Sequence, residues 1–251
     1  MCSSDLALTI RRELATARPE EFRPDLARSL SNLAAYLNDL GRPEEALTAA
    51  QEALTIRREL ATARPDEFRP DLASSLNNLS LWLAHLGRRE EGLAAIREAI
   101  TIRRELAAVR PDEFRSDLAR SLDNLAADLD DLGRPEEALA ARQEAVGLYR
   151  ELVKTRPEKF QPDLASSLND LAVYLKMLGR LEEALAASQE AVGFYRQLAA
   201  TRPEKFRPHL ADALDTLAIG LISLGRREEA LDPIQERVTI RQELAVRRPD
   251  A

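Results

Sequence analysis

The chain has 251 residues, of which 31% are charged and 4% are aromatic, and its formal net charge is −7 at pH 7. An acidic protein repels phosphate backbones, so this composition disfavours nucleic acid as a partner. No apolar run approaches the roughly 18 residues of a membrane-spanning helix, and no signal-peptide pattern appears, so we expect no membrane association. A single cysteine, Cys2, allows no disulfide within the chain and fits a reducing, cytoplasmic location.

A segment of 46 residues recurs along the sequence without insertion or deletion. A fixed period between 20 and 50 residues predicts a stacked array of repeats rather than a globule with one centre. Residues 6–16 match residues 52–62, so the array is expected to open with the second half of a repeat. The predicted single solenoid comprises a half repeat and five full repeats: 6–23, 24–69, 70–115, 116–161, 162–207 and 208–251.

Each full repeat is predicted to form two helices, A and B. Helix A of the first repeat runs from about Pro24 to Leu40, with Leu30, Leu33 and Leu37 at helical spacing on one face. Gly41 then ends the helix, since glycine adopts the left-handed conformation without steric cost.

Helix B of the first repeat opens at Pro43, with Glu44 and Glu45 in the first turn, where the helix dipole favours acidic residues. It is expected to run to about Ala63. In the fifth repeat Pro233 falls inside the predicted helix B, where it should remove one backbone hydrogen bond and cause a mild bend.

The connector 65–69 contains one large apolar residue, Phe68, in an otherwise polar segment. Its recurrence in every repeat predicts a buried plug between adjacent repeats, and a binding role for these rings is the less favoured alternative. Small residues also recur at fixed positions, such as Ala126 on helix A and Ala138 on helix B, where they would let two helices approach closely. The other phenylalanines of the connector position are Phe22, Phe114, Phe160 and Phe206.

The sequence Leu-Gly-Arg-x-Glu-Glu-Ala-Leu between the two helices, with a small residue, leucine and alanine on helix A, resembles the tetratricopeptide repeat. The resemblance covers the chain from residue 6 and is to the long variety, similar to kinesin light chain repeats and bacterial tandem arrays. It implies an all-α fold, a right-handed α-solenoid of antiparallel helix pairs. The ordinary repeat of this family ends helix B with proline, whereas this chain has Arg58, Arg104, Arg150, Arg196 and Gln242.

The resemblance also implies a concave groove lined by the A helices, where a partner would bind. The face of helix A opposite its leucines carries Arg28, Asn32, Ala35 and Asp39. In the family, an asparagine at the position of Asn32 often holds the main chain of a bound peptide, and a side-chain amide supplies the donor and acceptor that a peptide unit requires. The equivalents of Asn32 are Asn78, Asn124, Asp170 and Thr216.

Neighbouring positions complete the predicted peptide-binding set. Asn77 and Asn169 add polar character, Arg120 matches Arg28, and Trp82 lies at the flank of the groove. The alternative is a solvated face that is polar because nothing packs there. Trp82 has two interpretations, an anchor for a partner or a cover for the joint between two A helices.

No pattern in the sequence indicates an enzyme, a metal or a cofactor. The two histidines, His85 and His209, are far apart in sequence and have no nearby cysteine. No glycine-rich phosphate loop appears, and Ser29 and its equivalents lack a histidine partner.

We therefore expect a non-enzymatic scaffold that binds a peptide or a partner domain in its concave groove. Two alternatives remain open. The chain could be a structural element that associates weakly with itself through uncapped ends, Leu8–Leu14 and Val238–Leu244, or a sensor array within a larger signalling protein.

Overall fold

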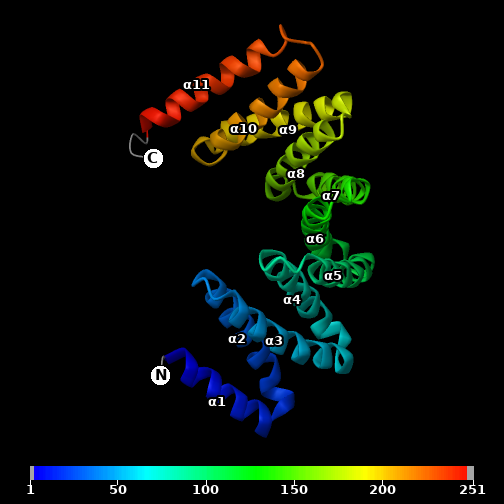
Figure 1. The fold of residues 1–251 in the computed structure, drawn as a ribbon, viewed down its shortest axis with the longest axis vertical. Coiled ribbons are helices and arrows are strands. Elements are labelled where there is room, and N and C mark those ends of the chain that lie inside the picture. Colours follow the sequence, from blue (N-terminus) through cyan, green and yellow to red (C-terminus); the bar gives the residue numbers. More distant parts are fainter. Residues whose placement is uncertain (1–2, 248–251) are drawn as a thin grey trace. The chain divides into compact units, whose positions relative to one another are not determined.

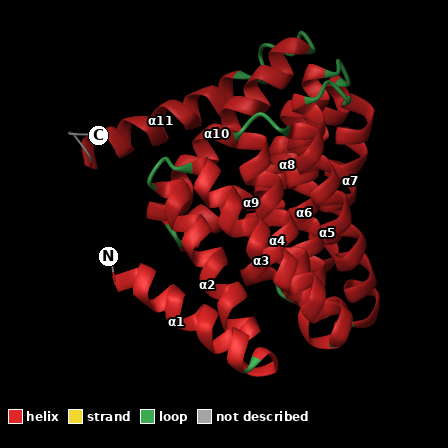
Figure 2. Ribbon diagram, turned by 60° about the horizontal axis from the view of Figure 1, so that its bottom comes forward, coloured by secondary structure: helices red, strands yellow, loops and turns green. Residues whose placement is uncertain are grey.

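The structure is a computed structural model that describes residues 3–247; Cys2 lies outside them. Within the described residues the chain forms eleven α-helices and no β-strand, joined by short loops (Figures 1 and 2). The chain divides into two compact units, residues 1–133 and 134–251. Unit 1 contains α1 (Ser3–Ala17), α2 (Pro19–Asp39), α3 (Pro43–Ala63), α4 (Pro65–His85), α5 (Arg89–Val109) and α6 (Pro111–Asp131). Unit 2 contains α7 (Pro135–Thr155), α8 (Pro157–Met177), α9 (Leu181–Thr201), α10 (Pro203–Ser223) and α11 (Leu231–Arg247).

Within each unit every helix packs against the next one along the chain, which confirms the predicted all-α solenoid of helix pairs. The even-numbered helices from α2 to α10 are the A helices, and the odd-numbered helices are the B helices. In addition, α4 contacts α6 and α8 contacts α10, so neighbouring A helices also touch one another. No helix of the described residues is long and apolar enough to cross a bilayer.

The A helices begin one and a half turns earlier than the sequence predicted. Helix α2 starts at Pro19, and Pro24 lies inside it. Proline at the first position needs no backbone donor, so the first of the two prolines can open the helix. The third repeat has Ser116 in place of Pro24, yet α6 has the same length as α2, so this second position does not set the start of the helix.

The recurrent phenylalanine therefore lies in the first turn of helix A, which corrects the prediction that it lies in a connecting loop. The prediction that its ring is buried is confirmed. Phe68, Phe114, Phe160 and Phe206 are buried, as predicted, and Phe22 is partly buried. An arginine just before the helix covers the ring from the solvent side, because its guanidinium lies 4.6 Å from the ring centroid of Phe22, Phe68 or Phe114.

The turn from helix A to helix B follows the predicted pattern. Gly41 has a φ of 70°, and its equivalents in the other four repeats are also in the left-handed region. The amide of Arg42 donates to the carbonyl of Leu37 at 2.9 Å, which satisfies one of the free carbonyls at the end of α2. Helix α3 then spans Pro43–Ala63, with the bounds that the sequence predicted.

Pro233 does not bend a longer helix, contrary to the prediction. Helix α11 begins at Leu231, four residues later than its equivalents, and the segment before it forms turns. Pro233 thus lies in the first turn of α11. The backbone N–H groups of a first turn have no acceptor within the helix, so the lack of an N–H in proline costs no helical hydrogen bond here.

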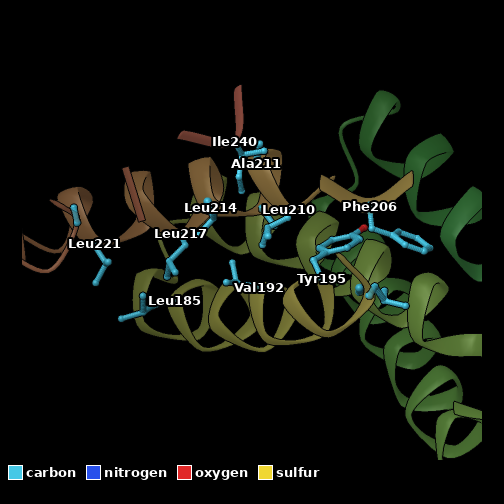
Figure 3. Close-up of a cluster of buried hydrophobic side chains, with 14 residues drawn as sticks. Leu185, Val192, Tyr195, Phe206, Leu210, Ala211, Leu214, Leu217, Leu221 and Ile240 are labelled. Atoms are coloured by element: carbon cyan, nitrogen blue, oxygen red, sulfur yellow. The ribbon is translucent and has the colours of Figure 1, made fainter. Parts of the chain in front are cut away.

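The core consists of leucines from the A helices packed against small and branched residues of the B helices. Ser80 and Ala126 are fully buried, and a Cβ added to Gly92 would lie 3.0 Å from the carbonyl oxygen of Ser80. Helices α4 and α5 therefore approach closely at this point. In unit 2, Figure 3 shows Leu210, Leu214, Leu217 and Leu221 of α10 facing Leu185, Val192 and Tyr195 of α9.

Candidate functional site

The predicted site lies on the exposed side of the A helices, which we call the A face. In unit 1 it is formed by α2, α4 and α6, and Arg28, Asn32, Asn78 and Arg120 are exposed on it. Asn124 is partly buried. The structure thus places most of the predicted residues of unit 1 at the surface. They occupy equivalent positions from repeat to repeat, and on α2 and α6 the arginine and the asparagine are one turn apart.

Neither arginine of this face is a free cation. Arg28 forms an ion pair with Asp25, and Arg120 forms the same pair with Asp117, in each case three residues earlier on its own helix. All four side chains are substantially exposed, so these pairs contribute little to stability. Their effect is to reduce the net positive charge that the A face of unit 1 offers a partner.

Asn77, by contrast, is buried and belongs to an internal polar network rather than to the exposed face. Its Oδ1 accepts hydrogen bonds from Nη1 of Arg103 at 3.2 Å, from Oγ of Ser121 at 2.8 Å and from Nδ2 of Asn124 at 3.4 Å. Nη1 of Arg103 also donates to the main-chain carbonyl of Asp117 at 3.0 Å. We therefore remove Asn77 from the residues that could meet a peptide.

The arginines of this network form a column that the sequence analysis missed. Arg11, Arg57 and Arg103 occupy one position on successive B helices and donate to Ser29, Ser75 and Ser121. Burial lowers the pKa of Arg57 and of Arg103. An arginine followed by a serine 18 residues later, in three consecutive repeats, was the signal that could have revealed this column.

In unit 2 most of these positions carry different chemistry, although Arg241 on α11 is again an arginine at the position of Arg103. Tyr195 replaces the arginine, Ala213 replaces the serine, and Thr216 replaces Asn124. Asn169, the equivalent of Asn77, is partly buried, and its Oδ1 is buried without a hydrogen-bond donor among the described residues.

Asp170 stands beside Asn169 on α8, at the position of Asn32, and its side chain is exposed. Surrounding protein atoms reduce the hydration of its carboxyl and raise its pKa, while the charge of Arg142 acts in the opposite direction.

The aromatic position at the flank of the A face differs in every repeat. Trp82 is partly buried, Tyr36 is 63% exposed, and Tyr174 is buried with its hydroxyl donating to the carbonyl of Pro135 at 3.2 Å. The equivalent residue in the third repeat is Asp128, which is only 5% exposed and whose Oδ2 has no partner among the described residues. Burial, with a smaller contribution from Asp131, raises the pKa of Asp128 to about 6, and the charge of Arg89 opposes this shift.

The exposed side of the B helices carries ion pairs between consecutive repeats. Arg58 contacts Glu98 at 2.5 Å in unit 1, and Arg196 contacts Glu236 at 2.5 Å in unit 2, in each case forty residues later. These arginines stand where the ordinary tetratricopeptide repeat has proline, so the departure from the family pattern supplies one partner of each ion pair. Open grooves of about 420 Å³ between α3 and α5, and about 490 Å³ between α9 and α11, lie beneath the two pairs.

No group of three or more potential metal ligands occurs among the described residues. His85 is exposed on α4, and the ring of His209 on α10 stacks on that of Tyr195, with 5.8 Å between centroids.

These features define an α-helical repeat protein whose A face is polar in unit 1. The chain belongs to the tetratricopeptide repeat family, whose sequence profile matches residues 26–61, 72–108, 118–158 and 164–199. A second profile, that of anaphase-promoting complex subunit 5, matches residues 198–245, the part of the chain that the first leaves largely uncovered. A comparison with curated proteins found no significant match.

Solved structures share the fold at low sequence identity. BtubC (BKLC) from P. vanneervenii is 20% identical with a TM-score of 0.75, over 96% of this chain and 89% of that one. A putative kinesin light chain from Podosopora anserina with nearly identical TPR-like repeats is 20% identical with a TM-score of 0.63, over 89% and 98%. MamA is 13% identical with a TM-score of 0.58, over 87% and 93%. The predicted likeness to the long, kinesin light chain-like variety is therefore confirmed at the level of the fold.

Proposed function

We propose that the chain is a protein-interaction scaffold and that the A face of unit 1 binds an extended peptide through the amides of Asn32 and Asn78. The observation that supports this proposal most strongly is the position of these two side chains. Both are exposed at equivalent positions of successive A helices, and neither side chain is used in a hydrogen bond within the described residues.

The chemistry of the amide suits a peptide main chain. Each amide offers a carbonyl oxygen and an NH₂ group, which match the N–H and C=O of a peptide unit. Asparagine is a mediocre helix former, so two exposed copies in mid-helix are not explained by helix stability. Asn124 continues the series in α6, but its Nδ2 also donates to the buried Asn77, so it has a supporting role.

A peptide-display selection on the full chain, followed by fluorescence anisotropy with the selected peptides, tests the proposal. Asn32→Ala combined with Asn78→Ala should weaken binding about tenfold, because two hydrogen-bonding groups are lost. Gln51→Ala is the matched control, since Gln51 is exposed on α3 outside the A face. Equal loss of affinity in the control, or none in the double variant, would contradict the role of the amides.

Association through the ends of the array stays an alternative prediction. Ile10 of α1 is 46% exposed and Val238 of α11 is 41% exposed, while Leu14 and Leu244 are partly buried. Light scattering over a range of concentrations distinguishes the two functions, because a mass that does not change with concentration excludes self-association.

A further inference from the structure

The A face of unit 2 carries exposed large apolar side chains on two adjacent helices. Val173 and Met177 lie one turn apart on α8, and Ile219 and Ile222 lie at the corresponding end of α10. Helices α8 and α10 contact each other, so the four side chains, with exposures of 36%, 67%, 41% and 45%, lie on the exposed side of two neighbouring helices. We call these four residues the apolar patch. Contiguous exposed apolar surface on a folded protein typically marks an interaction site.

The corresponding positions of unit 1 show that the repeat fold does not require this surface. Position by position, α6 has Ala127 for Val173 and Asp131 for Met177, and α2 has Ala35 and Asp39. On α4 the same positions hold Leu81, which is 37% exposed, and His85. At these positions unit 1 therefore has one large apolar side chain, whereas unit 2 has Val173, Met177 and Ile219.

Acidic side chains precede the apolar patch on the same two helices, and Asp170 lies only three residues before Val173. Asp170 precedes Met177 by seven residues on α8, and Asp212 precedes Ile219 by seven residues on α10. Seven residues of α-helix correspond to roughly 10 Å along the axis. Both carboxylates are exposed and are therefore accessible to a partner.

Neither carboxylate is strongly engaged within the unit. Asp170 forms no ion pair among the described residues, although the charge of Arg142 acts on its carboxyl. Asp212 contacts Arg241 at 3.3 Å, but both side chains are more than half exposed, so this pair is weak and replaceable.

A comparison of the two units indicates which kind of group would complete this region. In unit 1 the guanidinium of Arg103 satisfies Oδ1 of Asn77. In unit 2 the equivalent acceptor, Oδ1 of Asn169, is retained, while the equivalent of Arg103 is Tyr195. Unit 2 therefore leaves this one acceptor without a donor among the described residues, whereas on α11 the next equivalent of Arg103, Arg241, contacts Asp212.

We infer that the A face of unit 2 binds a peptide segment in which at least two large apolar side chains lie about 10 Å from a lysine or arginine. The apolar side chains cover Val173, Met177, Ile219 and Ile222, and the cation meets Asp170 and Asp212. The inference rests on the proposed function, because it takes the chain to be a peptide-binding scaffold, and it adds a peptide-binding surface on unit 2 to the one proposed on unit 1.

A random dodecapeptide display library selected on the full chain is the probe. Selected peptides should combine two or more large apolar residues with lysine or arginine. Their affinity, measured by fluorescence anisotropy, should fall about tenfold in Val173→Ser with Ile219→Ser, and about tenfold in Asp170→Asn with Asp212→Asn. Added salt should weaken peptide binding steeply in the wild type and in the serine variant, because both retain the two carboxylates. The asparagine variant lacks these carboxylates, so its affinity should depend little on salt.

The control variant is Leu81→Ser, since Leu81 is the equivalent of Val173 on α4 and is 37% exposed. Circular dichroism melts verify that each variant is folded. Peptides that bind but lose affinity only in the Asn32 and Asn78 variants would overturn this inference and leave the proposed function intact. A library that yields no binder on the wild type would overturn both. A dimer abolished by the serine variants would also overturn it, by assigning the patch to a second copy of the chain.

Discussion

The guanidinium of Arg103 on α5 donates to Oδ1 of Asn77 on α4 across 3.2 Å, and the two side chains are only 4% and 6% exposed. A buried cation costs free energy unless hydrogen bonds replace its hydration. Oδ1 of Asn77 is therefore required for the stability of this buried guanidinium. Asn77 and Asn78 are adjacent in sequence, yet one is structural and the other faces solvent.

Replacing Asn77 by alanine should lower the free energy of unfolding by about 2–3 kcal/mol, because three donors, one of them charged, lose their common acceptor. Urea denaturation followed by circular dichroism measures this change. Asn78→Ala, the matched control, should change the free energy by less than about 0.5 kcal/mol, as expected for an exposed site. Equal effects of the two substitutions would show that the network contributes nothing.

Overpacking at the helix contact provides a second test. Ala126 on α6 is fully buried, so Ala126→Phe should cost about 1–3 kcal/mol by forcing the neighbouring helices apart. Ala127 is exposed, and Ala127→Phe should leave the melting temperature nearly unchanged. A melting curve that Ala126→Phe does not shift would refute the register of helix A.

The buried carboxyl of Asp128 should make stability depend on pH. Its pKa is raised from 3.8 to about 6. At a pH between these two values the carboxyl is therefore protonated in the folded state and ionised in the unfolded state. Stability therefore falls as pH rises from about 4 to about 6, and Asp128→Asn should recover about 1–3 kcal/mol above pH 6.

Urea denaturation at pH 4 and at pH 7 tests this prediction. The gain from Asp128→Asn should be present at pH 7 and nearly absent at pH 4. Asp39→Asn is the control, because Asp39 is exposed at the end of α2. A gain of equal size at both pH values would exclude the titration of Asp128 as its cause.

The ion pairs between repeats should couple neighbouring B helices weakly. A double-mutant cycle on Arg58 and Glu98, each changed to alanine, should give a coupling energy of about 0.2–1 kcal/mol, because both side chains are about half exposed. The coupling should shrink in 1 M salt. A coupling that persists unchanged in salt would indicate packing rather than charge.

Much of the fold was predictable because its signals are local. Gly41 and Pro43 marked the turn and the start of α3, and the leucine spacing gave the buried face of each A helix. Two errors came from ambiguous prolines. Two prolines five residues apart left open which one begins α2, and Pro233 was compatible with either a bend or a later helix start.

The candidate site was predictable only in part. The sequence placed Asn32 and Asn78 on the exposed face correctly, because helical periodicity alone decides it. It could not show that Asn77 is buried, since that depends on Arg103, 26 residues away on another helix. The exposed position of Met177, by contrast, followed from the periodicity, because Met177 is the equivalent of Asp39.

The sequence by itself determined the repeat, the helix pairs and the family, because period, turn residues and apolar spacing act within a few residues along the chain. The tertiary structure alone decided which polar side chains are structural and which are free to bind. Hydrogen bonds and burial between helices depend on residues that are brought together only by packing. For this reason the same helix position is a buried acceptor with three donors at Asn77 and, in the part of the chain that the structure describes, an acceptor without a donor at Asn169.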